Sequence, residues 1–294
     1  MKCLQMSLKL LILGSICITL HIPVSSAQPS AASPEIPGPI LQLGSSQKQE
    51  ASPKDERAIP AGSSSRSAAG SQKRSKTLTL SQLLRKYPET IKTRGPHRKQ
   101  IALTFDDVPD PRFTPQVLDV LRRYHVHATF FIVGSRAEKH PGLVARMIRE
   151  GHTVGNHSYN HPQFGKISVN AFRTQIIHTE NIIKTTAGYK PRLIRPPYGD
   201  ISEPQLKWAK AHGYKLVNWN VDSLDWKGLS KSQVRNNIIA NAGKGAIILQ
   251  HGGGGRGSDL RGTIQALPEV ISIMRNRGYT FVTVPQLLQI NKEK

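Results

Sequence analysis

Two patterns of apolar residues alternate along the chain from about residue 99 onward. Short apolar runs, typical of buried strands, are followed by longer segments in which apolar residues recur every three or four positions, as in amphipathic helices. We expect strands at 101–105, 128–133, 153–154, 193–195, 215–219, 246–249 and 280–282, helices at 114–124, 141–150, 169–186, 203–212, 231–242 and 263–277, and a final element at 285–290. About seven strand–helix units in series predict a parallel α/β fold, and this number favours a barrel over an open sheet.

The first 97 residues lack this alternation. Residues 1–27 combine two lysines, an apolar run at 10–20 and small residues at 25–27, a pattern typical of a signal peptide. The run is shorter than the roughly 20 residues that span a membrane, and a retained N-terminal anchor is the alternative. Residues 28–97 predict a flexible basic linker rich in Ser, Pro and Gly, with an amphipathic stretch at 80–84 that allows a short helix. The expected divisions are therefore 1–27, 28–97 and a single α/β domain at 98–294.

The cysteines limit the chemistry that is available. The chain has two, Cys3 and Cys17, and both lie in the expected leader. A mature chain without the leader has no thiol, which excludes a disulfide framework, a CxxC redox site, a thiolate zinc site and a cysteine nucleophile. Any catalytic chemistry must therefore use oxygen and nitrogen groups.

Ionisable residues follow five of the expected strands. In β/α barrels, chemistry is carried by the loops after the strands. The residues at these positions are Asp106 and Asp107, His157 and His161, Arg195, Asp222 and Asp225, and His251. We expect them to meet at one rim of the barrel.

The histidine pair and the aspartate pair suggest a metal site. The i, i+4 spacing of His157 and His161 predicts both rings on one face of a helical turn, although such a pair arises easily by chance among 11 histidines. Adjacent Asp106 and Asp107 are often only a turn or a helix cap. In an extended backbone their side chains diverge, so that one would bind an ion and the other act as a base. Two histidines and one carboxylate, from Asp107 or Asp106, suit zinc or another divalent ion and leave positions for water and substrate.

The remaining polar residues have both simple and functional interpretations. Arg195, before two prolines, is either a surface charge or a guanidinium that holds a carboxylate ionised. Asp225 either caps a loop or stabilises a protonated His251, which is what a general acid needs. The glycines at 252–255 lack the lysine of a phosphate-binding loop, and the absence of Gly-x-Ser-x-Gly disfavours a serine esterase.

Five segments together resemble, in this order, the five motifs of polysaccharide deacetylases that share the NodB homology domain. They are TFDD at 104–107, HSYNH at 157–161, RPPYG at 195–199, DSLDW at 222–226 and LQH at 249–251. The resemblance covers roughly residues 99–290. It implies a distorted (β/α)7 barrel and metal-dependent removal of N-acetyl groups from a polysaccharide.

The resemblance also implies a role for each matching residue on the metal side of the site. Asp106 would be the general base, oriented by Arg195. Asp107, His157 and His161 would bind one divalent ion, expected to be Zn²⁺, with Co²⁺ or another divalent ion as the alternative.

On the opposite side, the resemblance implies that His251 is the general acid and that Asp225 tunes it. The backbone N–H of Tyr198 would help to hold the oxyanion, while Trp226 and Leu249 would line the pocket for the acetyl methyl group.

Val108 stands where the family usually has glycine, and Gly252 stands where aspartate often follows the acid histidine. Both departures put loop shape and substrate fit in question more than activity.

The charge of the chain bears on its partners. The formal net charge is +22, of which residues 28–97 contribute +6 and residues 98–294 contribute +14. Nucleic acid is the usual partner of such charge, but the export signal and the lack of a nucleic-acid motif argue against it. We expect an anionic bacterial cell wall instead, unless the charge only maintains solubility.

The expected substrate is N-acetylglucosamine in peptidoglycan, with chitin oligomers and acetylated xylan as alternatives. We expect a secreted or surface-associated monomer that contacts a membrane only through an uncleaved leader. The alternative from another class is a non-catalytic wall-binding barrel, against which the intact set of polar residues argues.

Overall fold

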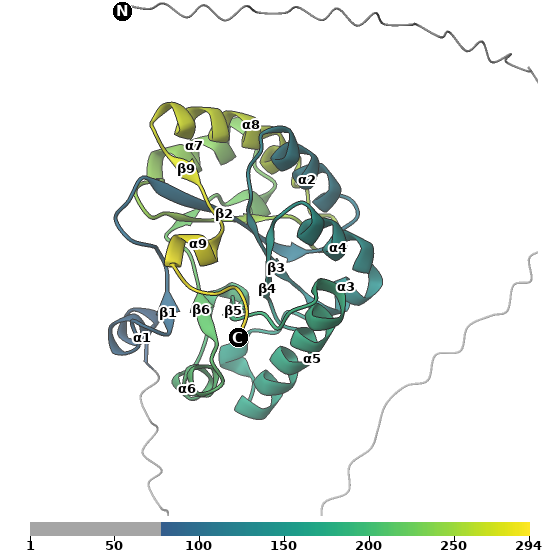
Figure 1. The fold of residues 1–294 in the computed structure, drawn as a ribbon, viewed down its shortest axis with the longest axis vertical. Coiled ribbons are helices and arrows are strands. Elements are labelled where there is room, and N and C mark those ends of the chain that lie inside the picture. The colour runs from purple at the N-terminus through teal and green to yellow at the C-terminus, as the bar shows by residue number, and fades with distance from the viewer. Residues whose placement is uncertain (1–77) are drawn as a thin grey trace, which may run out of the picture. The chain divides into compact units, whose positions relative to one another are not determined.

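Parallel strands form the centre of the protein, and helices surround them (Figure 1). The computed structural model describes residues 78–294. The predicted leader and most of the predicted linker lie outside this range. Along the sheet the strands follow the order β1 (Ile91–Lys92), β6 (Lys215–Val217), β5 (Leu193–Ile194), β4 (Thr153–Asn156), β3 (Thr129–Ile132), β2 (Gln100–Val108), β8 (Ile247–His251) and β7 (Val221–Asp222), with β9 (Thr280–Phe281) paired to β2. All neighbouring strands are parallel.

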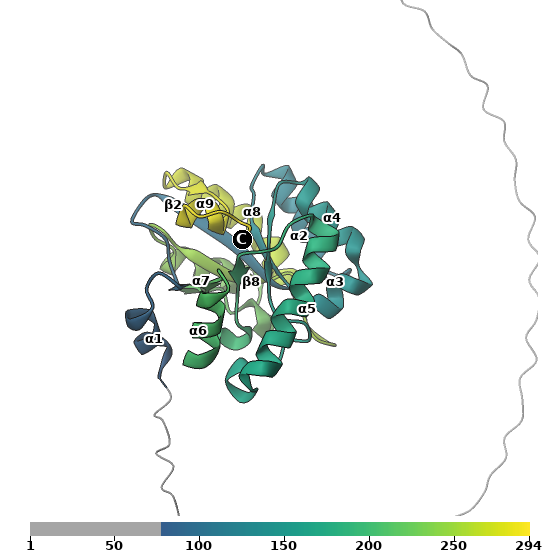
Figure 2. The same cartoon turned by 60° about the horizontal axis from the view of Figure 1, so that its bottom comes forward.

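Helices connect the strands and cover the outside of the curled sheet, as Figures 1 and 2 show from two directions. The helices are α1 (Leu80–Lys86), α2 (Thr114–Arg123), α3 (Gly134–Lys139), α4 (Pro141–Arg149), α5 (Val169–Ala187), α6 (Glu203–Ala211), α7 (Lys231–Asn241), α8 (Arg261–Asn276) and α9 (Val284–Leu288). This arrangement confirms the predicted distorted (β/α)7 barrel. None of the helices at 78–294 is long and apolar enough to cross a membrane.

The ends of several helices follow directly from the sequence. The Ser168 side chain accepts a hydrogen bond from the Ala171 amide and starts α5, and Gly188, with a φ of 81°, ends it. Ser230 and Gln233 form a capping box at the start of α7. These signals explain why the long helices lie close to where the apolar pattern predicts them.

The folded part also includes an element that was expected only as a possibility and others that the pattern did not predict. The amphipathic stretch at 80–84, which allowed a short helix, lies in α1. Residues 91–92, assigned above to the linker, form β1, which was not expected and pairs with β6. The short elements β7 and α3 were not expected either. A two-residue strand or a six-residue polar helix contains too few apolar positions to produce a periodic signal.

Successive side chains of each strand point alternately into the barrel and outward to the helices, so the core has an inner and an outer layer. On β2, Ile101, Leu103 and Phe105 pack outward against helices, whereas Ala102, Thr104 and Asp106 point into the barrel. At the base of the barrel, Val284 and Leu287 of α9 pack with Ala102, Phe131 and Ile247. Apolar side chains therefore fill the base of the barrel and leave its mouth to polar residues.

His152 is a buried titratable group on the approach to β4. Its side chain is 1% exposed, and its Nδ1 accepts a hydrogen bond from the Ala128 amide at 3.1 Å. The neutral ring must therefore carry its proton on Nε2, for which no acceptor lies within hydrogen-bonding distance among residues 78–294. Burial, with His127 and Arg146 nearby, lowers the pKa of His152 to about 4.

We predict that His152 makes the fold sensitive to acid. Because its pKa is about 4 in the folded state and about 6.5 when unfolded, folding favours the neutral form, and this stabilisation is lost as pH falls from 6.5 toward 4. The contribution between pH 7 and pH 5 is about 2 kcal/mol. Urea unfolding across this range should show a shallower decline for His152→Asn, whose Oδ1 can still accept from Ala128. Identical pH dependence in the two proteins would contradict the assignment.

Candidate active site

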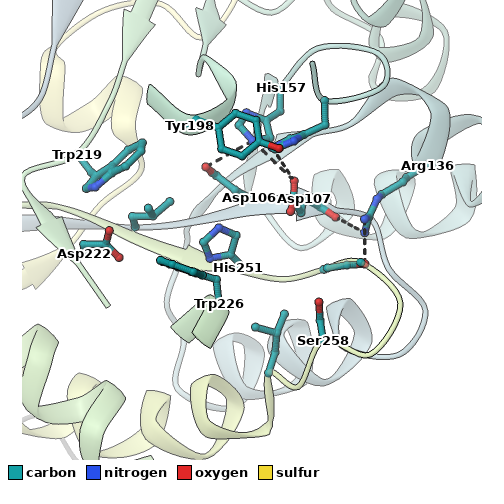
Figure 3. Close-up of a pocket in the computed structure, with 16 residues that line it drawn as sticks. Asp106, Asp107, Arg136, His157, Tyr198, Trp219, Asp222, Trp226, His251 and Ser258 are labelled. Carbon is teal, nitrogen blue, oxygen red and sulfur yellow. Dashed lines mark hydrogen bonds and ion pairs between the residues drawn. The ribbon is translucent and has the colours of Figure 1, made fainter. Parts of the chain in front are cut away.

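The polar residues at the strand ends meet around a pocket of about 650 Å³ at the mouth of the barrel (Figure 3). Eight of the residues singled out from the sequence for roles in the site line it: Asp106, Asp107, His157, His161, Tyr198, Trp226, Leu249 and His251. The other two, Arg195 and Asp225, lie behind this lining and are 0% and 1% exposed. The structure therefore brings the residues expected at one rim of the barrel together around a single pocket.

An irregularity in β2 brings two adjacent aspartates into one pocket. The strand does not end at Phe105 as predicted but continues to Val108, and its register against β3 shifts between these residues. Asp107 has a φ of 62°, which turns the chain locally. As a result both side chains reach the pocket, but they contact different partners: Asp106 bonds to Arg195, and Asp107 faces the histidines.

The two histidines do not lie on a helical turn, so that part of the sequence interpretation was wrong. Residues 157–161 form a loop in which Ser158 and His161 have φ values of 68° and 62°. The Asn156 side chain accepts from the Ser158 amide, and the Ser158 hydroxyl accepts from the His161 amide. These bonds fold the loop so that the two rings lie 4.9 Å apart between centroids.

Asp107, His157 and His161 form a set of donors that fits a divalent cation. Each offers a ligand atom within 4.8 Å of the others, and Nε2 of His161 lies 3.3 Å from Asp107 Oδ1. His157 Nδ1 lies 2.7 Å from the Arg195 carbonyl oxygen, which can only accept, so Nδ1 carries the proton and Nε2 has a free lone pair. Burial, together with His161, lowers the pKa of His157 to about 3. His157 is therefore neutral, as a metal ligand must be.

Arg195 holds Asp106 from inside the barrel. Its guanidinium donates to Asp106 Oδ1 at 2.8 Å and Thr104 Oγ1 at 2.7 Å, and further bonds reach the carbonyls of Val217 and Asn218. Burial raises the pKa of the Asp106 carboxyl, and Arg195 acts in the opposite direction. Asp106 is thus a fixed carboxylate with increased affinity for a proton.

His251 lies beside Asp106 on the neighbouring strand β8 and has the opposite electrostatic environment to His157. Its Nδ1 lies 2.7 Å from Asp225 Oδ1, and its amide donates to Asp225 Oδ2. Thr263 also donates to Asp225. Burial would lower the pKa of His251, but the Asp225 carboxylate outweighs this and raises it to about 9. His251 is therefore protonated at neutral pH.

Aromatic residues border the opening of the pocket. Tyr198 and Trp226 are 68% and 56% exposed, whereas Leu249 deeper in the pocket is 4% exposed. Trp219 and Asp222 also line the pocket, on the side opposite Arg136 in Figure 3. The site thus combines charged groups at its base with flat apolar surfaces at its edge, an arrangement suited to sugar rings.

Arg136 is a pocket residue that the sequence analysis missed. It donates to the Asp107 carbonyl at 2.8 Å and to the Gly254 carbonyl at 2.9 Å, and so links β2 to the loop after His251. It lies on α3, in the polar stretch GSRAEK, where an arginine looks like an ordinary surface charge. Nothing in the sequence alone indicated its position.

Val108 and Gly252, the two departures from the family pattern, contact each other. Val108 is fully buried in the core. A Cβ at residue 252 would lie 2.6 Å from Val108 Cγ1, which is too close for any side chain. The valine therefore fills space that is free only because residue 252 is glycine.

Comparisons with known proteins agree with this geometry. Residues 93–217 match the polysaccharide deacetylase family. A peptidoglycan-N-acetylglucosamine deacetylase of Bacillus cereus is 47% identical over 201 residues, which make up 68% of this chain and 72% of that protein. The chain belongs to the polysaccharide deacetylase family. The resemblance inferred from the five motifs is confirmed, and the family places this deacetylase among the hydrolases of amide bonds.

Two further relatives describe the extent of the similarity. The peptidoglycan-N-acetylmuramic acid deacetylase PdaC of Bacillus subtilis is 40% identical over 202 residues, 69% of this deacetylase but 41% of PdaC. A crystal structure of the peptidoglycan N-acetylglucosamine deacetylase Bc1960, in complex with a naphthyl N-hydroxybenzamide, superposes with a TM-score of 0.70 and 44% identity. It covers 72% of this deacetylase and all of that chain. The similarity therefore extends over the full length of the Bc1960 chain.

We predict that Val108 and Gly252 are energetically coupled. Gly252→Ala should lower the free energy of unfolding by about 1–3 kcal/mol, because the new methyl group overlaps Val108. In a Val108→Ala background the same change should cost much less. A double-mutant cycle measured by urea unfolding tests this, with Gly243→Ala as the control, since a Cβ there meets no atom within 4 Å. Additive costs for the two changes would show that they do not interact.

Proposed function

We propose that this polysaccharide deacetylase removes the N-acetyl group from N-acetylglucosamine in peptidoglycan, and that it uses one divalent cation, Zn²⁺ in preference to Co²⁺ or another ion. One observation supports this most strongly. Two histidines of the same pocket are held in opposite protonation states, His157 neutral and His251 charged. A metal ligand and a proton donor need these two states, respectively.

In the proposal, Asp107, His157 and His161 hold the cation. A divalent ion bound there would polarise the acetyl carbonyl and make water more acidic. Asp107 supplies the single negative charge of the ligand set, and the Arg195 carbonyl keeps the His157 lone pair directed toward Asp107. Nitrogen and oxygen ligands of this kind suit zinc.

Asp106 is the proposed general base. It would accept a proton from the water whose oxygen attacks the acetyl carbonyl carbon. Its raised pKa makes the carboxylate a better proton acceptor, and the bond from Arg195 leaves Oδ2 free for this role.

His251 is the proposed general acid. Cleavage of the C–N bond leaves the electron pair on the sugar nitrogen, which must gain a proton to leave as an amine. Asp225 binds Nδ1 of His251, so Nε2 is the nitrogen that can donate this proton. The products are acetate and a free amino sugar.

The residues at the edge of the pocket would bind the sugar and the acetyl group. We propose that the Tyr198 amide donates to the oxygen that becomes negative during attack, an interaction often worth about 10²–10³ in rate. Leu249 and Trp226 line the pocket and would surround the acetyl methyl group.

The proposed substrate also bears on where the protein acts. Because peptidoglycan lies outside the cytoplasm, and because residues 1–27 have the pattern of a signal peptide, we propose a secreted or wall-associated monomer. The net charge of +22 suits an anionic wall.

Acetate release from defined polymers tests this function. We expect purified protein with added zinc to release acetate from peptidoglycan faster than from chitin oligomers or acetylated xylan, and a chelator to stop the reaction. Mass spectrometry of the digested glycan should place the loss on N-acetylglucosamine rather than N-acetylmuramic acid. Faster release from chitin oligomers or acetylated xylan would show that this polymer, and not peptidoglycan, is the substrate. No release from any polymer would favour a non-catalytic wall-binding barrel.

We predict that Asp106→Asn reduces kcat by about 10²–10⁴-fold, because the amide retains the acceptor for Arg195 but cannot take a proton. Metal content, measured by mass spectrometry of the purified protein, should be unchanged, since Asp106 lies outside the proposed ligand set. The exposed Asp119→Asn on α2 serves as the control. An active Asp106→Asn protein, or one that no longer binds metal, would refute the assignment of Asp106 as base.

A further inference from the structure

A group of positive charges, all but one without an ion pair within residues 78–294, lies at the end of the barrel opposite the pocket. Four segments lead into the adjacent strands β2, β3, β8 and β9, and together they contain eight Lys and Arg residues and no Asp or Glu. The segments span residues 93–99, 122–127, 242–246 and 275–279, and the second and fourth begin in the last turns of α2 and α8. We call their cations, Arg94, Arg98, Lys99, Arg122, Arg123, Lys244, Arg275 and Arg277, the basal surface. All eight residues are exposed.

Backbone carbonyls rather than carboxylates fix several of these side chains. Lys99 donates to the Arg277 carbonyl at 2.9 Å, Arg94 to the Lys244 carbonyl at 3.1 Å, and Arg275 to the Tyr124 carbonyl at 2.7 Å. Carbonyl oxygens position a cation without neutralising it. Arg122 alone among the eight forms an ion pair within residues 78–294, with Asp119.

Cations elsewhere in the described part of the chain are more often paired. Arg112 pairs with Asp110, Arg261 with Asp259, and both Lys231 and Arg235 with Glu269. Stabilisation of helix ends accounts for only part of the basal surface. Arg122, Arg123 and Arg275 lie in the last turns of helices, where cations are favourable, whereas Arg94, Arg98, Lys99 and Lys244 lie in loops.

We propose that the basal surface binds a linear phosphodiester polymer of the cell wall. Fixed like charges repel one another, and a polyanion relieves this repulsion while releasing its own counterions. Six of the eight cations are arginines, and five of these form no ion pair within residues 78–294. Arginine suits phosphate oxygens through its planar donor fork. A lipid surface fits less well, because proteins that bind to one usually also insert apolar side chains into it. The exposed large apolar residues at 78–294 are Leu80, Ile177, Tyr198 and Trp226, and none of them lies in the four segments of the basal surface.

The position of this surface has a functional consequence. The pocket lies at the carboxyl ends of the strands and the basal surface at their amino ends. A polymer on the basal surface would therefore leave the pocket open and keep the barrel close to the wall. The inference goes beyond the proposed function and does not depend on the deacetylation chemistry.

Binding to fluorescently labelled inorganic polyphosphate at several salt concentrations tests the proposal. The variant Arg98→Glu/Arg123→Glu/Lys244→Glu changes three side chains that form no hydrogen bond or ion pair within residues 78–294. We expect this variant to bind at least about tenfold more weakly than wild type. The slope of the logarithm of its binding constant against the logarithm of the salt concentration should be smaller by about three, because about three fewer counterions are released. The control Lys139→Glu/Lys166→Glu/Arg173→Glu changes net charge equally, near the opposite ends of the strands, and should bind nearly as wild type does.

Thermal unfolding and activity on a small soluble acetylated oligosaccharide should match wild type in both variants, which separates this test from a failure of the proposed function. Equal weakening in both variants, or no binding by wild type, would overturn the proposal. Preference for anionic phospholipid vesicles would assign the surface to a membrane instead, and preference for duplex DNA with as many phosphates would assign it to nucleic acid.

Discussion

The buried guanidinium of Arg195 is the contact on which the rest of the site depends. A charge without solvent is tolerated only when it is paired and hydrogen-bonded, and Arg195 meets this condition through Asp106, Thr104 and two backbone carbonyls. It also lies 4.1 Å from the centre of the Phe131 ring. Its own carbonyl oxygen accepts from His157. One residue thus orients the proposed base and a proposed metal ligand, and connects β5 to β2 and β6.

Differences in immediate neighbours give identical side chains different properties in this pocket. His157 Nδ1 faces the Arg195 carbonyl, and its Nε2 lies 3.8 Å from Asp107 without a hydrogen bond; burial, together with His161, lowers its pKa to about 3. His251 is bonded to the buried carboxylate of Asp225, and its pKa rises to about 9. Burial alone would lower both pKa values, and the difference comes from the carboxylate of Asp225, which is hydrogen-bonded directly to the ring of His251. Asp106 and Asp107 also have different partners: Asp106 bonds to Arg195, and Asp107 faces the histidines.

The sequence predicted the parts of the fold that have long periodic signals. The barrel, its long helices and the convergence of strand ends follow from apolar periodicity and from the rule that parallel strands end on one side. The five motifs supplied the residues of the pocket. Short elements such as β1 and α3 gave no signal, and Arg136 was missed because its role comes from carbonyls distant in sequence. The shape of the histidine loop depends on left-handed residues such as Ser158, which spacing alone does not reveal.

X-ray absorption spectroscopy of the zinc-loaded protein tests the central claim most directly, because it reports the ligands of the ion independently of any substrate. The account predicts one equivalent of zinc per chain, a spectrum with two imidazole ligands and oxygen, and loss of one imidazole contribution in His161→Ala. Failure to take up zinc stoichiometrically, or a spectrum without imidazole, would contradict it.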